Sequence, residues 1–222
     1  MATEVMMVRK QIVLSAAKLF MRQGFTNTSV KEISVESGVS ENAIYYEMKT
    51  KENILTELIG HVLAKQKLAA IEIVGDITDD RLLLYATEKV LQLHLAESSE
   101  QMRELYTMVY SIPKAWDIIK QSNAIRLKNV FGESHPELAL SDFYELEIAA
   151  GGIVRGYLST PCDMYFTMDH KVSRLITSIF KVFDVSEEKI SKTLEFISQF
   201  DFDELAQDTL NSLPEYFQEK VK

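Results

Sequence analysis

The sequence predicts an all-α protein, and three observations lead to this prediction. Apolar residues recur at the helical spacing of three to four positions through most of the 222 residues. The pairs Asn-Gly and Asp-Gly, which mark β-hairpins, do not occur, and there are only 8 Gly and 4 Pro. A hydrophobic fraction of 46% is sufficient for a packed core. We therefore expect helices throughout and no sheet.

Three helices are predicted at the N-terminal end. Helical periodicity covers about 8–23, and a glycine follows as a C-terminal stop. A hydroxyl at Thr28 or Ser29 then caps a short second helix. After the turn "GVS", Ser40 caps a third helix of about nine residues, which ends near Lys49.

The rest of the chain continues as helices separated by polar or proline-containing breaks. Pro113 and Pro161 mark two of these breaks, and "GESHPE" at 132–137 forms a loop. Helices are expected at about 50–73, 79–97, 99–112, 114–131, 141–159, 169–184, 187–199 and 201–212.

The charge is distributed unevenly along the chain. Residues 1–52 carry seven Lys/Arg and six Asp/Glu, which leaves 17 basic and 27 acidic residues after them and accounts for the total of −9. A near-neutral front and an acidic back suggest two parts with different roles, of which only the front suits phosphates. We predict two domains, 1–52 and 53–222.

Two short helices joined by a three-residue turn, with one helix before them, form a helix-turn-helix arrangement. The segments "AAKLFMRQGFTNTSVKEIS" and "SGVSENAIYYEMKTKENIL" carry its specific features in order. Over residues 9 to about 58 the chain resembles the N-terminal domain of the TetR/AcrR family of transcriptional regulators. The resemblance implies a DNA-binding head at 1–52, followed at 53–222 by a larger helical domain for effector binding and dimerisation.

The third predicted helix has two distinct faces. Ile44 and Met48, four residues apart, point inward, so Tyr45 and Tyr46 are not both core. Phenolic hydroxyls and lysines contact phosphates, whereas residues at the front of the helix read base edges. Supported by the resemblance, we predict DNA contacts by Thr28, Ser29, Ser40, Glu41, Asn42, Ala43, Tyr45, Tyr46, Lys49 and Lys51.

Glu41 and Glu47 depart from the family pattern, which commonly has a basic or neutral residue and a histidine at these two positions. Two carboxylates reduce the attraction of this helix for phosphates. They indicate either cytosine-specific reading with modest affinity, or a head that keeps the fold and has lost DNA binding. We favour the former because both tyrosines and both lysines, Lys49 and Lys51, remain.

A single head covers one half-site, so useful specificity implies a dimer. The segment "EIAAGGIVRGYL" at 147–158 offers small residues that allow another helix to approach closely, with "KVSRLITSIFKVF" at 171–183 as its expected partner. Close packing within one chain is the alternative. The predicted dimer residues are Ala149, Gly152, Gly156, Leu175 and Ile179.

Aromatic and polar residues on the middle helices are candidates for lining an effector site. Sites for small molecules between helices are apolar with a few polar groups, although the same residues are often plain core. The predicted ligand-binding residues are Tyr85, His94, Tyr106, Tyr110, Trp116 and Arg155.

Several kinds of chemistry have no motif here. The four histidines are far apart, and neither a metal-ligand spacing nor a phosphate loop nor a nucleophile elbow occurs, so we expect no metal, no cofactor and no catalysis. No apolar run approaches the roughly 20 residues of a membrane span. The N-terminus does not resemble a secretory signal, and the single cysteine agrees with a reducing compartment, so a cytoplasmic protein is expected.

The combined prediction is a ligand-responsive transcriptional regulator, with repression as the expected direction. It binds a pseudo-palindromic DNA operator as a homodimer and is released by a small-molecule effector of unknown identity. The alternative is a helical dimer that binds a small molecule or a protein and carries a vestigial head without DNA affinity.

Overall fold

The computed structural model describes residues 2–75, 77 and 80–220, and most of these residues are helical. The helices are α1 (Ala2–Gln23), α2 (Val30–Ser37), α3 (Glu41–Met48), α4 (Lys51–Val74), α5 (Arg81–Glu97), α6 (Glu100–Met108), α7 (Pro113–Phe131), α8 (Leu140–Ser159), α9 (Met168–Val182), α10 (Glu187–Ile197) and α11 (Phe202–Lys220). The described residues form no strand, which confirms the all-α prediction.

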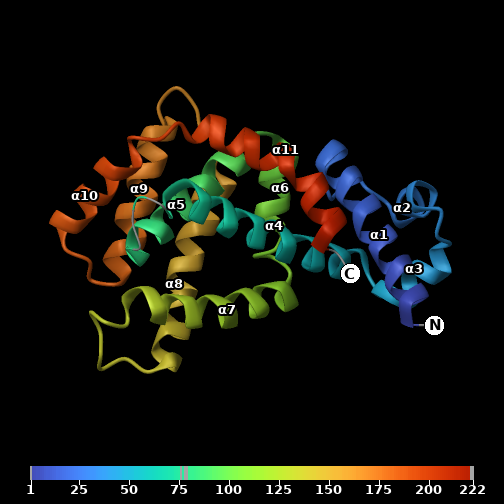
Figure 1. Ribbon diagram of the computed structural model, residues 1–222, viewed down its shortest axis with the longest axis horizontal. Helices are drawn as coiled ribbons and strands as arrows, with labels where there is room; N and C mark the ends of the chain where they lie inside the picture. Colours follow the sequence, from blue (N-terminus) through green and yellow to red (C-terminus); the bar gives the residue numbers. More distant parts are fainter. Residues whose placement is uncertain (1, 76, 78–79, 221–222) are drawn as a thin grey trace.

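The molecule consists of a small head and a larger body (Figure 1). Helices α1, α2 and α3 form the head at one end, and α4 leads from it into the body. In the body α5 contacts α4 and every helix from α6 to α11, while α9 and α10 lie at the end farthest from the head. The predicted domain boundary between residues 52 and 53 falls in the first turn of α4, the helix that joins the two parts.

The head folds around a small apolar core. Ile12 and Phe20 of α1, Ile44 and Met48 of α3 and Leu55 of α4 are each at most 2% exposed. Ile44 and Met48 therefore point inward as predicted. Because α2 and α3 are each only 8 residues long, they depend on this burial more than on intrinsic helix propensity.

Helix α5 is buried around its whole circumference. The nine residues from Tyr85 to Leu93 are all buried, and Leu95 and Ala96 are buried after the half-buried His94. A helix in this position is expected to be apolar on all sides. However, α5 carries Glu88, Lys89 and Gln92 into the interior, where each polar group needs a partner.

Helix ends differ from the predictions at several places. Helix α1 begins at Ala2, and α6 ends at Met108, with a turn over 109–112. The prediction that the last helix ends at residue 212 was wrong, because α11 continues through Pro214 to Lys220. Buried Leu213 and Phe217 anchor its last turns on the body, and this packing outweighs the hydrogen bond that the proline removes.

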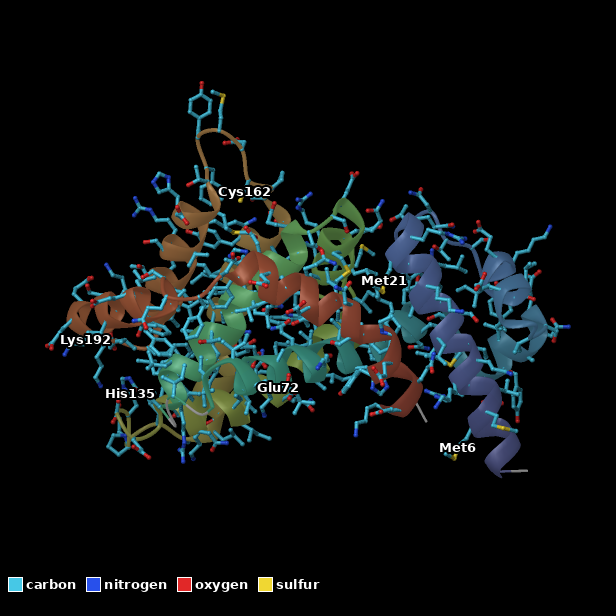
Figure 2. The ribbon with its side chains drawn as sticks, turned by 45° about the horizontal axis from the view of Figure 1, so that its top comes forward. Met6, Met21, Glu72, His135, Cys162 and Lys192 are labelled. Carbon is cyan, nitrogen blue, oxygen red and sulfur yellow. The ribbon has the colours of Figure 1, made fainter. Side chains whose placement is uncertain are left out.

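The segment between α8 and α9 extends away from the body (Figure 2). Met164 and Tyr165 in this segment are 81% and 82% exposed. Cys162, at its base, is half-buried, and burial raises the pKa of its thiol. Raising this pKa disfavours the reactive thiolate, so Cys162 has the properties of an inert thiol.

Candidate functional site

The two short helices of the head are fixed by side-chain caps. Ser29 caps α2 by accepting from the N–H of Glu32, and the Glu32 carboxylate accepts in return from the N–H of Ser29 at 2.8 Å. These hydrogen bonds, with the backbone bond first, lower the pKa of Glu32 to about 2. Ser40 caps α3 by accepting from the N–H of Ala43 at 3.3 Å. Local side-chain bonds thus set the start of both helices.

Capping at Ser40 orients one face of α3 toward solvent. Glu41 and Asn42 are exposed at its front, and Tyr45 and Tyr46 are 50% and 74% exposed in its last turn. The Lys49 ammonium lies 5.2 Å from the centroid of the Tyr46 ring. This face combines amide, carboxylate, phenol and ammonium groups on one short helix, a composition suited to contacts in a DNA groove.

Several residues predicted to contact DNA have other roles in the structure. Thr28 is 1% exposed, and its hydroxyl donates to the Gly24 carbonyl at 2.7 Å. Ala43 is half-buried and packs against the head core. Ser29 and Ser40 are exposed, but their hydroxyls already serve as helix caps. We leave Thr28 out of the proposed DNA face because its hydroxyl does not reach the surface.

Lys51 turns inward rather than toward the exposed face of α3. Its ammonium donates to the carbonyls of Phe25 and Thr28, each at 2.7 Å, and lies 4.2 Å from the centroid of the Phe25 ring. Burial lowers the pKa of this ammonium. Lys51 therefore holds the turn between α1 and α2 against the start of α4, and we assign it a structural role.

Replacing Lys51 by Met should destabilise the head more than it weakens phosphate attraction. Two charge-assisted hydrogen bonds are lost, so we expect the free energy of unfolding to fall by about 2 kcal/mol. The matched control is Lys49→Met, on the exposed face, which should change stability little but flatten the salt dependence of DNA binding. Urea unfolding and operator affinity at several salt concentrations measure both quantities. A flatter salt slope for Lys51→Met at unchanged stability would contradict the structural role.

One carboxylate of α6 reaches from the body to the head. Glu104 accepts from the N–H groups of Phe25 and Thr26 at 2.8 and 2.9 Å, and also from the Thr26 hydroxyl. Gly24 beside them has a φ of +86°, and a Cβ there would lie under 3.0 Å from the Glu104 carboxylate. Glycine is thus required both by the left-handed backbone and by the approach of Glu104.

Four of the six predicted ligand-binding residues lie near one another in the body. Tyr85 and Tyr106 are buried, and the Tyr106 hydroxyl donates to Gln66 Oε1 at 3.0 Å. The half-buried rings of Tyr110 and Trp116 are 5.3 Å apart. Burial raises the pKa of Tyr85, Tyr106 and Tyr110, so these phenols stay protonated.

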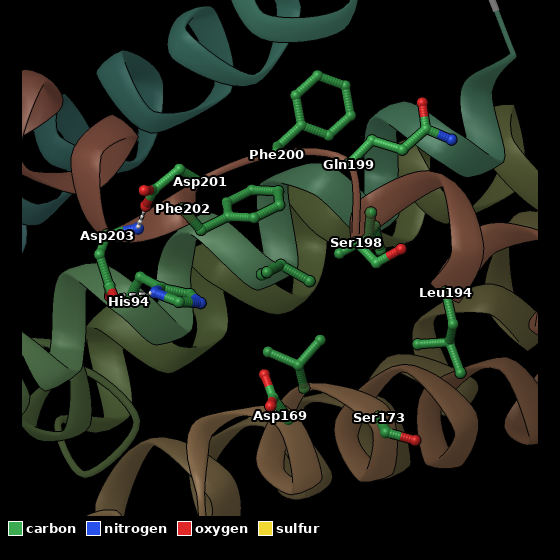
Figure 3. Close-up of a pocket in the computed structure, with 13 residues that line it drawn as sticks. His94, Asp169, Ser173, Leu194, Ser198, Gln199, Phe200, Asp201, Phe202 and Asp203 are labelled. Carbon is green, nitrogen blue, oxygen red and sulfur yellow. Dashed lines mark hydrogen bonds and ion pairs between the residues drawn. The ribbon is translucent and has the colours of Figure 1, made fainter.

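His94 lies elsewhere, in an open groove of about 680 Å³ between α5, α9 and the junction of α10 and α11 (Figure 3). Its Nδ1 is 2.7 Å from Asp203 Oδ1, and Phe202 packs beside the imidazole. Asp169 and Asp201 also line this groove. Across the described part of the chain, no group of three or more His, Cys, Asp or Glu side chains is arranged to hold a metal ion.

Arg155 is exposed and points away from the buried aromatic residues. Its guanidinium donates to the Ser111 hydroxyl at 3.1 Å and so links α8 to the turn between α6 and α7. The sequence analysis included it among the polar residues of the middle helices that could line a ligand site. Its position on the outer face of α8 gives it no access to the buried aromatic cluster.

The residues predicted for the dimer interface divide into two groups. Ala149, Gly152 and Gly156 lie on the exposed face of α8, and a Cβ at either glycine would have no heavy atom within 4 Å. Leu175 and Ile179 are 1% and 0% exposed and belong to the core of this chain. The exposed glycines border a shallow groove of about 490 Å³ lined by Gly152, Ile153, Gly156, Tyr157, Thr160, Phe166 and Ser178.

Sequence reasoning missed a cluster of buried charges beside the aromatic residues. Glu88 and Lys89 of α5 are 4% and 6% exposed, and Glu147 of α8 is 3% exposed. Arg126 of α7 forms an ion pair with Glu88. The adjacent Glu-Lys pair inside the apolar run of α5 was the only signal in the sequence, and surface helices contain such pairs just as often.

Comparison with known proteins agrees with the arrangement of the head. Residues 12–58 match the family model described as bacterial regulatory proteins, tetR family. The HTH-type transcriptional repressor NicS of Pseudomonas putida is 26% identical over 102 residues, which cover 46% of this chain and 40% of NicS. The resemblance stated from the sequence is confirmed.

The fold of most of the chain, head and body together, is also found in a solved structure. The crystal structure of RolR in complex with the ligand resorcinol superposes with a TM-score of 0.69 and covers 87% of this chain and 96% of RolR. The sequences are 13% identical, so this likeness concerns the fold alone. Among the described helices, none is both long and apolar enough to span a membrane.

Proposed function

We propose that this chain is a repressor that binds a two-fold-symmetric operator as a homodimer and is released by a small molecule, because residues 12–58 match the tetR-family model. The observation that carries the proposal is the exposed face of α3, with Tyr45, Tyr46 and Lys49 beside a helix start capped by Ser40. The protein acts in the cytoplasm, where such an operator is accessible, and catalyses no reaction.

On the operator, α3 lies in the major groove. Asn42 pairs with adenine and Glu41 accepts from the amino group of cytosine, since both side chains are exposed at the front of the helix. Tyr45 and Tyr46 donate to phosphate oxygens without adding charge, and Lys49 adds an electrostatic contact. Ser29 and Ser40 contribute through the helix starts that they cap.

Dimerisation pairs the exposed faces of α8 in two copies. The small residues Ala149, Gly152 and Gly156 leave open space above the backbone, which allows a second helix to approach closely. Leu175 and Ile179 support this surface from below because they hold α9 against the body. A dimer places two heads on half-sites separated by about one helical turn, roughly 34 Å, or a multiple of it.

Release of DNA requires a contact through which the body acts on the head. Glu104 of α6 is that contact, because its carboxylate holds the N–H groups of Phe25 and Thr26 directly after α1. An effector that binds better when α6 is displaced weakens this contact and changes the separation of the heads. The effector can lower operator affinity by no more than the ratio of its own affinities for the two conformations.

The effector binds within the body, near Tyr85, Tyr106, Tyr110 and Trp116. RolR, whose fold this chain shares, binds resorcinol, which supports a small-molecule site in a body of this kind. The groove at His94 is open on one side and borders α9 and α10 rather than α6. The aromatic cluster is therefore the better place for an effector, because Tyr106 belongs to α6 and Tyr110 directly follows it.

Selection of binding sites from a random duplex pool tests the DNA-binding part of the proposal. The purified protein should enrich a two-fold-symmetric site at low salt and lose affinity at higher salt, because phosphate contacts release counterions. Tyr46→Ala serves as the control that should enrich no site. Size-exclusion chromatography with light scattering then measures whether the protein is a dimer alone and on the selected site.

The absence of enrichment at low salt would favour the alternative function, a sensor with a vestigial head. Glu41 is exposed and Glu47 half-buried on α3, and both carboxylates reduce phosphate attraction. Glu41→Gln with Glu47→Gln should then restore non-specific binding. If the wild-type protein binds its site but saturating effector leaves the affinity unchanged, DNA binding stands and effector release is excluded.

A further inference from the structure

Four ionisable side chains meet in the interior of the body. Glu88 and Lys89 come from α5, Arg126 from α7 and Glu147 from α8. Lys89 and Glu147 are 6% and 3% exposed, and the Arg126 side chain is 22% exposed. The cost of burying charges requires that each be paired or hydrogen-bonded.

Three of these groups have strong partners, and Lys89 does not. Glu88 pairs with Arg126, and Glu147 accepts from Asn123 Nδ2 at 2.6 Å. Lys89 Nζ makes one long contact, 3.4 Å to Gln92 Oε1, and lies 5.3 Å from the centroid of the Tyr85 ring. No described carboxylate forms an ion pair with it. Glu88 and Glu147 act on Lys89 only at longer range, so Lys89 is a buried ammonium without a direct ion-pair partner.

The electrostatics around Lys89 favour an anion over a cation. Burial lowers the pKa of Lys89 and raises the pKa of Glu147, so neither charge is well stabilised. An added cation would be repelled by Lys89 and Arg126, and the two carboxylates that could attract it are already engaged, Glu88 by Arg126 and Glu147 by Asn123. An added anion supplies the missing partner of Lys89, while Arg126 already balances Glu88. One Glu88 oxygen, Oε2, has no hydrogen-bond partner and can accept a hydroxyl from a ligand.

Trp116 closes the space next to this cluster. Its indole packs so tightly on Gly151 of α8 that a Cβ there would lie under 3.0 Å from the ring and 3.3 Å from Glu147 Oε1. The Tyr110 ring also packs against the indole, with 5.3 Å between the centroids. Glu147 Oε1 thus lies beside the same Gly151 as the indole, and Glu147 interacts electrostatically with Lys89. An indole that swung out would leave a flat slot leading toward Lys89.

The local structure permits Trp116 to move. It lies in the first turn of α7, whose N-terminal residue Ile112 provides no side-chain cap. The preceding residues 109–112 form a turn rather than a helix. Uncapped first turns open at a lower free-energy cost than helix interiors. This turn also joins α7 to α6, the helix that carries Glu104 to the head.

We propose that the effector is a small aromatic monocarboxylate whose ring replaces the Trp116 indole between Tyr110 and Gly151 and whose carboxylate accepts from Lys89 Nζ. The flat slot and its aromatic wall specify a planar ring, and the unpaired ammonium specifies the carboxylate. A ring hydroxyl directed at Glu88 adds a further bond. This assignment rests on the proposed function, because it identifies the chemistry of the same effector.

Trp116 is the single tryptophan of the sequence, so its fluorescence reports directly on the slot. The full-length protein is titrated with benzoate, 3-hydroxybenzoate and 4-hydroxybenzoate, and with benzamide and benzylamine as neutral and cationic analogues. Calorimetry provides a second measure of affinity. We expect saturable fluorescence changes with at least one carboxylate and binding of its uncharged analogue weaker by roughly 10-fold to 100-fold.

Variants distinguish recognition from folding. Lys89→Met should weaken carboxylate binding by roughly 10-fold to 100-fold while its melting temperature stays equal or rises, since an unpaired buried charge is removed. Lys89→Arg should retain the preference for the anion. Lys120→Met is the matched control, because Lys120 Nζ lies 5.5 Å from the Trp116 ring but outside the buried cluster, and it should bind like wild type.

Each remaining outcome decides between the two proposals. Equal affinity for benzamide, wild-type binding by Lys89→Met, or no binding by any carboxylate overturns the inference about the effector. If the selected operator is released by a neutral or cationic compound instead, the proposed function stands and this inference fails. If carboxylates bind through Lys89 but operator affinity is unchanged, the inference about the site stands and effector release fails.

Discussion

Gly24→Ala should lower the free energy of unfolding by about 3–5 kcal/mol. Alanine at a φ of +86° strains the backbone, and its Cβ would displace the Glu104 carboxylate. The N–H groups of Phe25 and Thr26 would then lose their acceptor. Urea unfolding followed by far-UV circular dichroism measures the loss.

Gly38→Ala is the matched control for this effect. Its φ of +69° is also left-handed, but a Cβ there would meet no heavy atom within 4 Å. Only the backbone strain applies, so we expect a loss of about 1–2 kcal/mol. Similar losses for the two variants would show that Glu104 contributes nothing to the position of the head. Glu104→Gln, which keeps the size of the side chain, should fall between them.

Replacing Tyr45 and Tyr46 together by Ala should reduce operator affinity by about 100-fold or more, because each phenol provides a hydrogen bond to phosphate. Both side chains are at least half exposed, so their removal should leave stability nearly unchanged. Tyr46→Phe separates the hydroxyl from the ring and should account for part of the loss. Fluorescence anisotropy with the selected duplex measures the affinities.

The salt dependence identifies the origin of this loss. Phenols carry no charge, so the tyrosine variants should keep the slope of log affinity against log salt, whereas Lys49→Met should reduce it by about 0.9 for each head. Tyr165→Ala, at an 82% exposed position between α8 and α9, should bind like wild type. A tyrosine variant with unchanged affinity would remove α3 from the proposed DNA face.

The sequence was sufficient to predict the head because its signals are local. Caps at Ser29 and Ser40, the glycines after α1 and α2, and the spacing of Ile44 and Met48 act within four residues of one another. The exposed face of α3 follows directly from these features. Capping and periodicity are therefore enough to predict which side of this helix faces solvent.

The sequence did not reveal the contacts that join distant parts of the chain. Lys51 bonds to Phe25, 26 residues away, and Glu104 to the same residue from 79 residues away. Helical periodicity gives Leu175 and Ile179 an apolar face but does not tell whether that face meets the chain's own core or another copy. For the same reason, Glu147 in a helix of small residues gave no sign of its burial.

The attachment of α1 to three helices of the body limits how the head can move. In its first half Arg9 pairs with Glu57 of α4 and the Lys10 ammonium donates to the Gln218 carbonyl of α11, and beyond its end Glu104 of α6 holds Phe25 and Thr26. The attachments at Lys10 and Phe25 lie about 15 residues apart, roughly 22 Å along a helix. Two points alone would leave a rigid head free to rotate about the line between them, but contacts with three different helices remove this rotation. While all three contacts persist, α3 moves with the body, and any change in its orientation must first break one of them.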